Sequence, residues 1–271
     1  MSRTVFFVSD GTAITSETLG HALLAQFPQV EFEQVWIPFV DDGDAALEAA
    51  AQINAANKKD QAAPIVVNTI IDKSLSSVIH ASEGIVLDLF SAFLHTLEKA
   101  LGSKPQLTVG RSHSLEDFDR YEDRMDATNY ALNHDDGESI EFGKADLILV
   151  GVSRSGKTPT CLYMALHYGV KAANYPLTED DLDGLRLPPF LRRHKHKIVG
   201  LMIDPERLSQ IRETRRPNSR YASLRQCHKE VDLAESLLRT EGITIFQTTH
   251  ASIEEISSRV LSELGVQREM F

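Results

Sequence analysis

The 271-residue chain contains 42% hydrophobic and 25% charged residues, a composition typical of a folded globular protein. No apolar stretch approaches the roughly 20 residues of a membrane-spanning helix, so we expect no membrane insertion. The net charge of −11 argues against general nucleic-acid binding, which requires an excess of Lys and Arg on the contact surface.

Two features indicate where the protein resides. The N-terminus, MSRTVFFVSDGT, has neither the basic region nor the long apolar region of an export signal. The two cysteines, Cys161 and Cys227, are far apart and predict neither a disulfide framework nor a structural zinc site. We therefore expect a cytoplasmic protein, and a homo-oligomer is among the states that the sequence leaves open.

Residues 1–105 alternate strand and helix patterns, which predicts an N-terminal α/β domain. The first predicted strand, 3–10, precedes a helix over 15–27, whose start has the pattern of a capping box around Glu17. The other predicted elements are strands at 30–39 and 63–71 and helices at 44–59, 72–82 and 84–101. Strands that alternate with helices pair in parallel through right-handed crossovers.

Residues 106–143 differ in character and are interpreted as the connection between two domains. The segment begins within a stretch of turn residues without periodicity, continues as a charged amphipathic helix over 115–134, and ends in a polar turn.

A second α/β unit with mainly parallel strands is predicted over 144–271. Its first strand, DLILV, covers 146–150. The other predicted elements are strands at 170–177, 196–204 and 243–249 and helices at 159–169, 205–216, 220–242 and 252–265.

The stretch GVSRSGKT at 151–158 fits the P-loop pattern G-x-x-x-x-G-K-[ST]. It follows a predicted strand and precedes a predicted helix, an arrangement that directs backbone N–H groups and the helix dipole at one anion. The sequence therefore predicts a P-loop kinase-like C-terminal domain, the alternative being a strand-to-helix turn without a ligand. The candidate nucleotide-binding residues are Gly151, Val152, Ser153, Arg154, Ser155, Gly156, Lys157 and Thr158.

The residue types in this loop predict separate roles. Gly151 and Gly156 allow the backbone to curl around a phosphate, where a Cβ atom would obstruct positive φ angles or close approach. Lys157 is expected to bind terminal phosphate oxygens as a compact charge. Arg154 is expected to add a bidentate phosphate contact.

A magnesium ion would be bound next to the loop. Thr158 offers a hydroxyl group to Mg²⁺, and Asp204, at the end of the predicted strand 196–204, is the candidate carboxylate ligand. Because Pro205 follows, Asp204 is equally well placed to be the N-cap of the next helix.

Two further acidic positions compete for the role of catalytic base. Asp10 lies at the carboxyl end of the first strand, where α/β sheets bind their ligands. His134, Asp135 and Asp136 precede the P-loop strand, and Asp136 in particular could accept a proton from an acceptor hydroxyl. The alternatives are a helix cap for Asp10 and a solvated turn for the second group.

A basic segment extends from Arg186 to Lys229 and contains twelve Lys or Arg residues against three acidic ones. Its net charge is therefore +9, within a chain whose total is −11. The segment is either a solvated helix face or a surface that receives phosphates or an acidic protein partner.

Four separated motifs occur together in this order. They are FFVSDGTAITSETLGHALLAQF, HDDG, GVSRSGKTPTCLYMALHYGVKAANYPL and IDPERLSQIRETRRPNSRYASLRQC. In their sequence, order and spacing they closely resemble the phosphoenolpyruvate synthase and pyruvate, phosphate dikinase regulatory proteins, and the resemblance extends from residue 4 to residue 271.

The resemblance implies a bifunctional serine/threonine kinase and phosphorylase. Such a protein uses ADP to phosphorylate a threonine of its target enzyme, here phosphoenolpyruvate synthase, and thereby inactivates it. It reverses the modification with inorganic phosphate and releases pyrophosphate. The loop spacing itself does not distinguish ADP from ATP. Under this reading four arginines are available to neutralise phosphate charge: Arg215, Arg216, Arg220 and Arg225.

Two other functions fit the same loop. A small-molecule P-loop kinase would use the same cradle, although about 150 residues precede the loop here. A nucleotide-sensing module without catalysis would use the basic segment to bind a partner.

Overall fold

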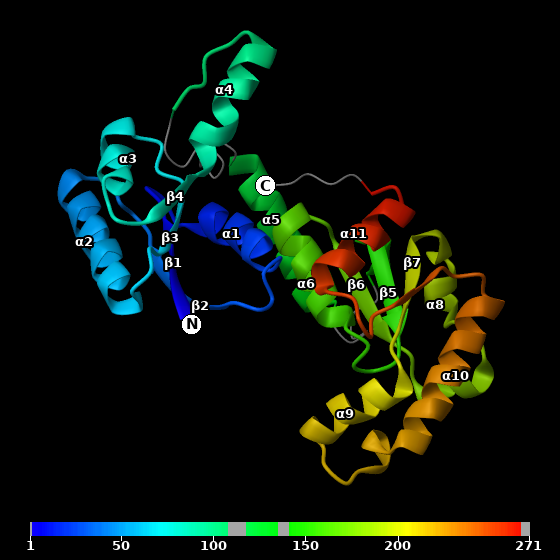
Figure 1. Ribbon diagram of the computed structural model, residues 1–271. Coiled ribbons are helices and arrows are strands. Elements are labelled where there is room, and N and C mark those ends of the chain that lie inside the picture. The colour runs from blue at the N-terminus through cyan, green and yellow to red at the C-terminus, as the bar shows by residue number, and fades with distance from the viewer. Residues whose placement is uncertain (1, 108–117, 135–140, 267–271) are drawn as a thin grey trace. The chain divides into compact units, whose positions relative to one another are not determined.

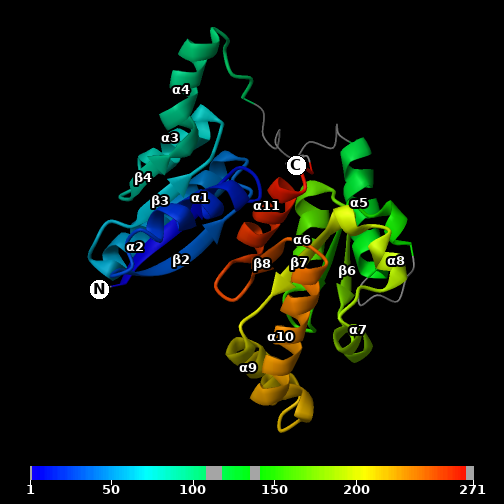
Figure 2. The ribbon, with the colours of Figure 1, turned by 90° about the vertical axis from the view of Figure 1, so that its right-hand side faces the viewer.

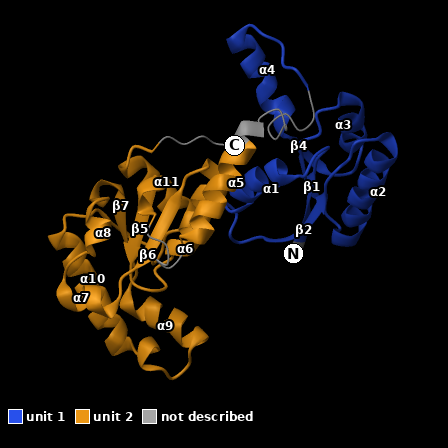
Figure 3. Ribbon diagram, turned by 180° about the vertical axis from the view of Figure 1, so that it is seen from behind, with its two compact units in different colours: residues 1–114 blue, residues 115–271 orange. Residues whose placement is uncertain are grey.

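The computed structural model describes residues 2–107, 118–134 and 141–266 (Figure 1). The chain forms two compact units, Met1–Ser114 and Leu115–Phe271 (Figure 3). Within the described ranges, no helix combines the length and the apolar character needed to cross a membrane.

The first unit is a four-stranded parallel sheet with the strand order β2-β1-β3-β4, as the α/β prediction requires. Its strands are β1 (Ser2–Val8), β2 (Glu31–Ile37), β3 (Ile65–Asn68) and β4 (Ile85–Asp88). Its helices are α1 (Ile14–Leu24), α2 (Gly43–Asp60), α3 (Lys73–His80) and α4 (Leu89–Leu101).

The alternation of side chains along β1 explains how this sheet is covered. Phe6 points to one face and packs with Ile53 of α2 and Ile79 of α3. Phe7 points to the other face, where Leu24 of α1 packs. Because both faces of the sheet are covered, the centre of β1 (Val5–Val8) is a continuous apolar run.

Two local predictions for this unit are wrong. Helix α1 begins after Ala13, which has a φ of 64° and makes no side-chain capping bond, so the predicted capping box is not formed. The predicted helix 84–101 is divided into β4 and α4, and Asp88 caps α4 by accepting a hydrogen bond from the Ser91 N–H. The three apolar residues Ile85–Leu87 have no periodicity of their own, and pairing with β3 makes them part of a strand.

The second unit repeats this strand order as β6-β5-β7-β8, again with all strands parallel (Figure 2). Its strands are β5 (Leu147–Gly151), β6 (Ala172–Pro176), β7 (Ile198–Met202) and β8 (Ile245–Gln247). Its α-helices are α5 (Phe118–Asn133), α6 (Lys157–Tyr168), α7 (Glu179–Gly184), α8 (Pro189–Arg192), α9 (Pro205–Arg215), α10 (Leu224–Thr240) and α11 (Ile253–Glu263). Short 3-10 turns are η2 (Phe142–Lys144), η3 (Lys195–Lys197) and η4 (Arg220–Ala222).

Helices cover both faces of this sheet. On one face Leu149 packs with α5, α6 and α11, through side chains that include Ala131 and Met164. On the other face Val150 packs with α10 and the α7–α8 region, through side chains that include Leu238 and Leu191. Helix α5, from the segment interpreted as a connection, therefore contributes to the core of the second unit.

Glu241 ties the α8 region to the end of α10 and predicts a pH-dependent contribution to stability. Its carboxylate is 9% exposed and accepts hydrogen bonds from Arg192 Nε and Nη2 at 3.2 and 2.8 Å. These bonds lower the pKa of Glu241, so its stabilising effect is present above about pH 4.5 and is lost as the pH falls through the lower folded-state value.

Replacing Glu241 with Gln is expected to reduce the free energy of unfolding by about 1–2 kcal/mol at pH 7. Urea unfolding measures this at pH 7 and pH 3.5. The difference in the free energy of unfolding between the variant and the wild type should be smaller at pH 3.5. Glu235→Gln, which removes only the exposed pair with Arg239, is the control and should have little effect. An unchanged difference at both pH values would contradict this role of the charge.

Candidate functional site

The predicted P-loop lies between β5 and α6, at the carboxyl edge of the second sheet. Strand β5 pairs with β6 on one side and β7 on the other, so the chain reverses its crossover direction at this point. Ligands of open α/β sheets bind in the crevice at such a switch point. The fold therefore places 151–158 where a ligand site is expected.

The two glycines of the loop are required for different reasons. A Cβ atom on Gly151 would lie 2.2 Å from the Leu201 carbonyl oxygen of β7, so this glycine allows two central strands to approach. Gly156 has a φ of 91° and open space around it, so its requirement is conformational. For Gly151 the structure therefore adds a strand-packing role to the predicted close approach of a phosphate.

Lys157 starts α6 and is only 5% exposed. Its Nζ donates a hydrogen bond to the Val152 carbonyl at 2.8 Å, which holds the ammonium group inside the loop. The loop borders a cavity of about 440 Å³, and the residues that the structure describes contribute three basic side chains and no acidic one to its lining. The lining residues are Ser153, Arg154, Gly156, Lys157, Thr158, Pro159 and Arg215. This charge distribution fits an anion.

The two candidate magnesium ligands have different surroundings. Thr158 accepts a hydrogen bond from Asn174 Nδ2 at 3.4 Å. Asp204 caps α9, since its Oδ1 accepts from the N–H groups of Glu206 and Arg207 at 3.1 and 3.3 Å. Hydrogen bonding with Glu206 and with the Arg207 N–H lowers the pKa of Asp204, which keeps the carboxylate charged at neutral pH.

The structure thus bears out the helix-cap reading of Asp204. Across the described ranges, no group of three or more His, Cys, Asp or Glu side chains could hold a metal ion. Thr158 belongs to the described lining of the loop cavity and Asp204 does not. A single hydroxyl group fits Mg²⁺ that is carried mainly by nucleotide phosphates, which is how this ion commonly binds.

Asp10 follows β1 in the first unit and is 8% exposed. Its Oδ2 accepts a hydrogen bond from the Ile71 N–H at 2.7 Å, which ties the β3–α3 loop to the end of β1. It does not cap α1. Because the first sheet has its switch point between β1 and β3, Asp10 occupies the ligand edge of that unit.

The second candidate base group is described only in part, since Asp135 and Asp136 lie outside the described residues. His134 is buried, and its Nδ1 lies 2.8 Å from the Tyr130 carbonyl oxygen. Its ring stacks on Tyr130 with centroids 3.8 Å apart. Burial raises the pKa of Tyr130 to about 12, so its hydroxyl stays protonated and donates to the Glu141 carbonyl oxygen.

Residues of the basic segment line two separate cavities. Arg215 lines the loop cavity, whereas Arg220 and Arg225 line a separate cavity of about 530 Å³. Arg212 is fully buried against the loop, and the sequence analysis did not assign it a site role. Leu208 lies four residues before Arg212, so the two share one face of α9. This spacing from an apolar residue is the signal in the sequence that Arg212 faces the core.

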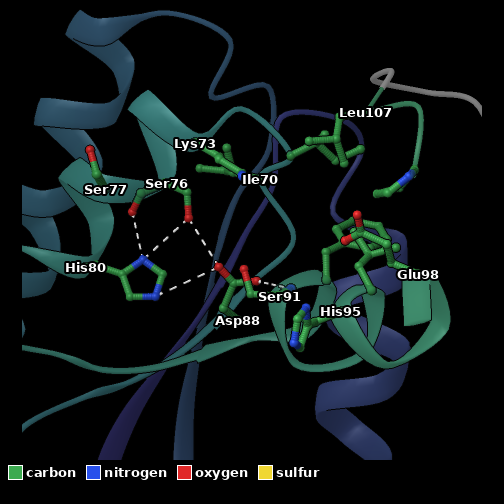
Figure 4. A pocket seen from close by; sticks show the side chains of 14 residues that line it. Ile70, Lys73, Ser76, Ser77, His80, Asp88, Ser91, His95, Glu98 and Leu107 are labelled. Atoms are coloured by element: carbon green, nitrogen blue, oxygen red, sulfur yellow. Dashed lines mark hydrogen bonds and ion pairs between the residues drawn. The ribbon is translucent and has the colours of Figure 1, made fainter. Parts of the chain in front are cut away.

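The first unit contains another cavity, of about 510 Å³, at the carboxyl ends of β3 and β4 (Figure 4). Ser76, His80 and Asp88 meet on its wall, with Ser76 Oγ 3.4 Å from His80 Nδ1 and 3.3 Å from Asp88 Oδ2. Ser76 Oγ also accepts from Asn68 Nδ2 at 2.9 Å. These contacts join α3 to the end of β4 at the wall of the cavity.

Comparison with known proteins agrees with the sequence resemblance. Residues 5–261 match the model of a family described as kinase/pyrophosphorylase. The chain is 54% identical over 269 residues to a protein of Stenotrophomonas maltophilia (strain K279a), and 52% identical over 269 residues to one of Xanthomonas campestris pv. campestris (strain B100). Each alignment covers 99% of this chain and 98% of the relative. Both relatives bear the name "Putative phosphoenolpyruvate synthase regulatory protein". The chain belongs to the kinase/pyrophosphorylase family.

Proposed function

We propose that this protein regulates phosphoenolpyruvate synthase, as an ADP-dependent threonine kinase that inactivates it and a phosphate-dependent phosphorylase that reactivates it. The observation that carries the proposal is the loop cavity, where Lys157, Arg154 and Arg215 surround a glycine-containing strand-to-helix turn. Family membership and the names of the relatives support the reaction class and the target.

In the kinase direction, the threonine oxygen attacks the β-phosphorus of ADP. The bond from that phosphorus to the bridging oxygen breaks, AMP leaves, and the threonine proton passes to a base. Lys157 would bind the transferred group and Arg154 its non-bridging oxygens, which stabilises the charge of a largely dissociative transfer. Asp10, Asp135 and Asp136 are the candidate bases.

In the phosphorylase direction, an oxygen of inorganic phosphate attacks the phosphorus of phosphothreonine. The bond to the threonine oxygen breaks, the threonine takes up a proton, and pyrophosphate leaves. Both directions transfer a phosphoryl group between oxygens, so the same basic lining could serve both. Mg²⁺ bound through Thr158 and Asp204 would neutralise phosphate charge.

The deciding experiment incubates the purified protein with ADP, Mg²⁺ and phosphoenolpyruvate synthase. Threonine phosphorylation of the synthase with formation of AMP is expected, followed by release of pyrophosphate when inorganic phosphate is added. Transfer to a small metabolite would instead indicate a small-molecule kinase. Nucleotide binding without any transfer would indicate a sensing module.

A further inference from the structure

Arg212 of α9 is buried to 0% exposure, which is rare for an arginine. Its Nη2 donates to Glu230 Oε2 of α10 at 2.7 Å and to the Ser153 carbonyl at 3.1 Å. Its Nη1 donates to the Tyr221 carbonyl at 3.1 Å, and the guanidinium lies 4.0 Å from the centroid of the Tyr221 ring. A single side chain thus joins α9, η4 and α10 to the P-loop.

Stability alone does not account for this buried charge. The desolvation cost of a buried ion pair offsets much of its Coulomb attraction, so apolar residues often stabilise such a position equally well. Arg212 Nε is also buried without a hydrogen-bond partner, which adds to the cost. The guanidinium donates hydrogen bonds to Glu230, to the Ser153 carbonyl and to the Tyr221 carbonyl. These three bonds are better explained by a need to hold the bound groups in one geometry.

Tyr221 fixes the same loop residue from a second direction. Its hydroxyl lies 2.9 Å from Ser153 Oγ, while its ring supports the guanidinium of Arg212. Ser153 is therefore held at both its carbonyl oxygen and its hydroxyl group. Glu230, which accepts a hydrogen bond from Arg212, is positioned in turn by Gln226. Its Oε1 accepts a hydrogen bond from Gln226 Nε2 at 2.9 Å.

This anchoring sets the direction of the next backbone N–H. The peptide group that joins Ser153 to Arg154 is planar, so its N–H points away from the carbonyl that Arg212 binds. Arg154 has a φ of 75°, a left-handed conformation that a non-glycine residue keeps only when its surroundings hold it. Both residues line the loop cavity.

We propose that Arg212 and Tyr221, supported by Glu230, form an arginine clamp whose two positioning residues hold the Ser153–Arg154 peptide of the P-loop in its phosphate-binding conformation. The inference rests on the proposed role of the loop as a nucleotide site. The clamp acts through Ser153, whose carbonyl and hydroxyl it binds.

Tyr221→Phe is the sharpest variant, because it removes the hydroxyl and keeps the ring under Arg212. Calorimetric titration of the full-length protein should show ADP binding weakened about fivefold, the effect of one lost hydrogen bond, with little change in melting temperature. Tyr175→Phe is the matched control, since it removes a 3.0 Å bond to Asp181 away from the loop. It should bind ADP like the wild type.

Arg212→Lys keeps the charge but cannot form the forked set of bonds. It should weaken ADP binding about tenfold and lower kcat by at least the same factor, because the transferred phosphate is misplaced. Arg192→Lys alters a comparable forked pair with Glu241 in the same unit and should leave both quantities unchanged.

Nucleotide binding by Tyr221→Phe at the wild-type level would overturn the clamp, whether or not Arg212→Lys folds. Wild-type protein that binds ATP but not ADP would overturn the proposed donor, and the same variants titrated with ATP would still test the clamp. Wild-type protein that binds neither nucleotide would overturn both.

Discussion

Lys157→Ala is expected to lower phosphoryl transfer by at least about a thousandfold while the fold is retained. The Lys157 ammonium group is held at the loop by its hydrogen bond to the Val152 carbonyl, and alanine would remove the charge assigned to the transferred phosphate. The backbone N–H groups at the start of α6 are unchanged in this variant, so nucleotide binding should weaken less than phosphoryl transfer. The measurement is transfer of labelled β-phosphate from ADP to the synthase, with circular dichroism as the check on folding.

Lys197→Ala is the matched control. Lys197 Nζ also donates to backbone carbonyls, those of Ala145 at 2.6 Å and Gly143 at 3.3 Å. Lys197 is the last residue of η3, just before β7, and is not among the residues that line the loop cavity. Its removal should leave transfer unchanged. Near-normal transfer by Lys157→Ala would contradict the catalytic role assigned to the loop.

Gly151→Ala is expected to destabilise the second unit by about 3 kcal/mol, the upper end of the usual cost of overpacking. The added Cβ would lie 2.2 Å from the Leu201 carbonyl oxygen, and this neighbour is the backbone of a central strand, which cannot rotate away as a side chain can. Strands β5 and β7 would have to separate at the edge that carries the loop. Urea unfolding measures the loss.

Two further glycine variants separate crowding from conformational strain. Gly156→Ala meets no neighbouring atom but must keep a φ of 91°, so it should cost only about 1–2 kcal/mol in stability while impairing nucleotide binding. Gly43→Ala, in helix α2 with neither problem, should be neutral or slightly stabilising. Equal stability losses for Gly151→Ala and Gly156→Ala would contradict the packing role of Gly151.

The architecture and the loop could be predicted because both depend on local sequence patterns. Apolar runs alternating with amphipathic helices predict parallel α/β units, and the loop pattern between a strand and a helix predicts an anion site. Strand β4 was missed because three apolar residues next to a helical segment show no periodicity, and only pairing with the backbone of β3 makes them a strand.

The sequence by itself determined the α/β class, the family and the position of loop 151–158 between a strand and a helix, since these are encoded in residues that are neighbours along the chain. The tertiary structure decided the roles that depend on distant partners. It assigns Gly151 to contact with Leu201, Asp204 to the cap of α9, and Arg212 to a buried clamp on Ser153. Whether an arginine side chain is buried, and which carbonyl it faces, is decided only when helices and strands pack. A list of basic residues therefore could not distinguish Arg212 from the exposed arginines around it.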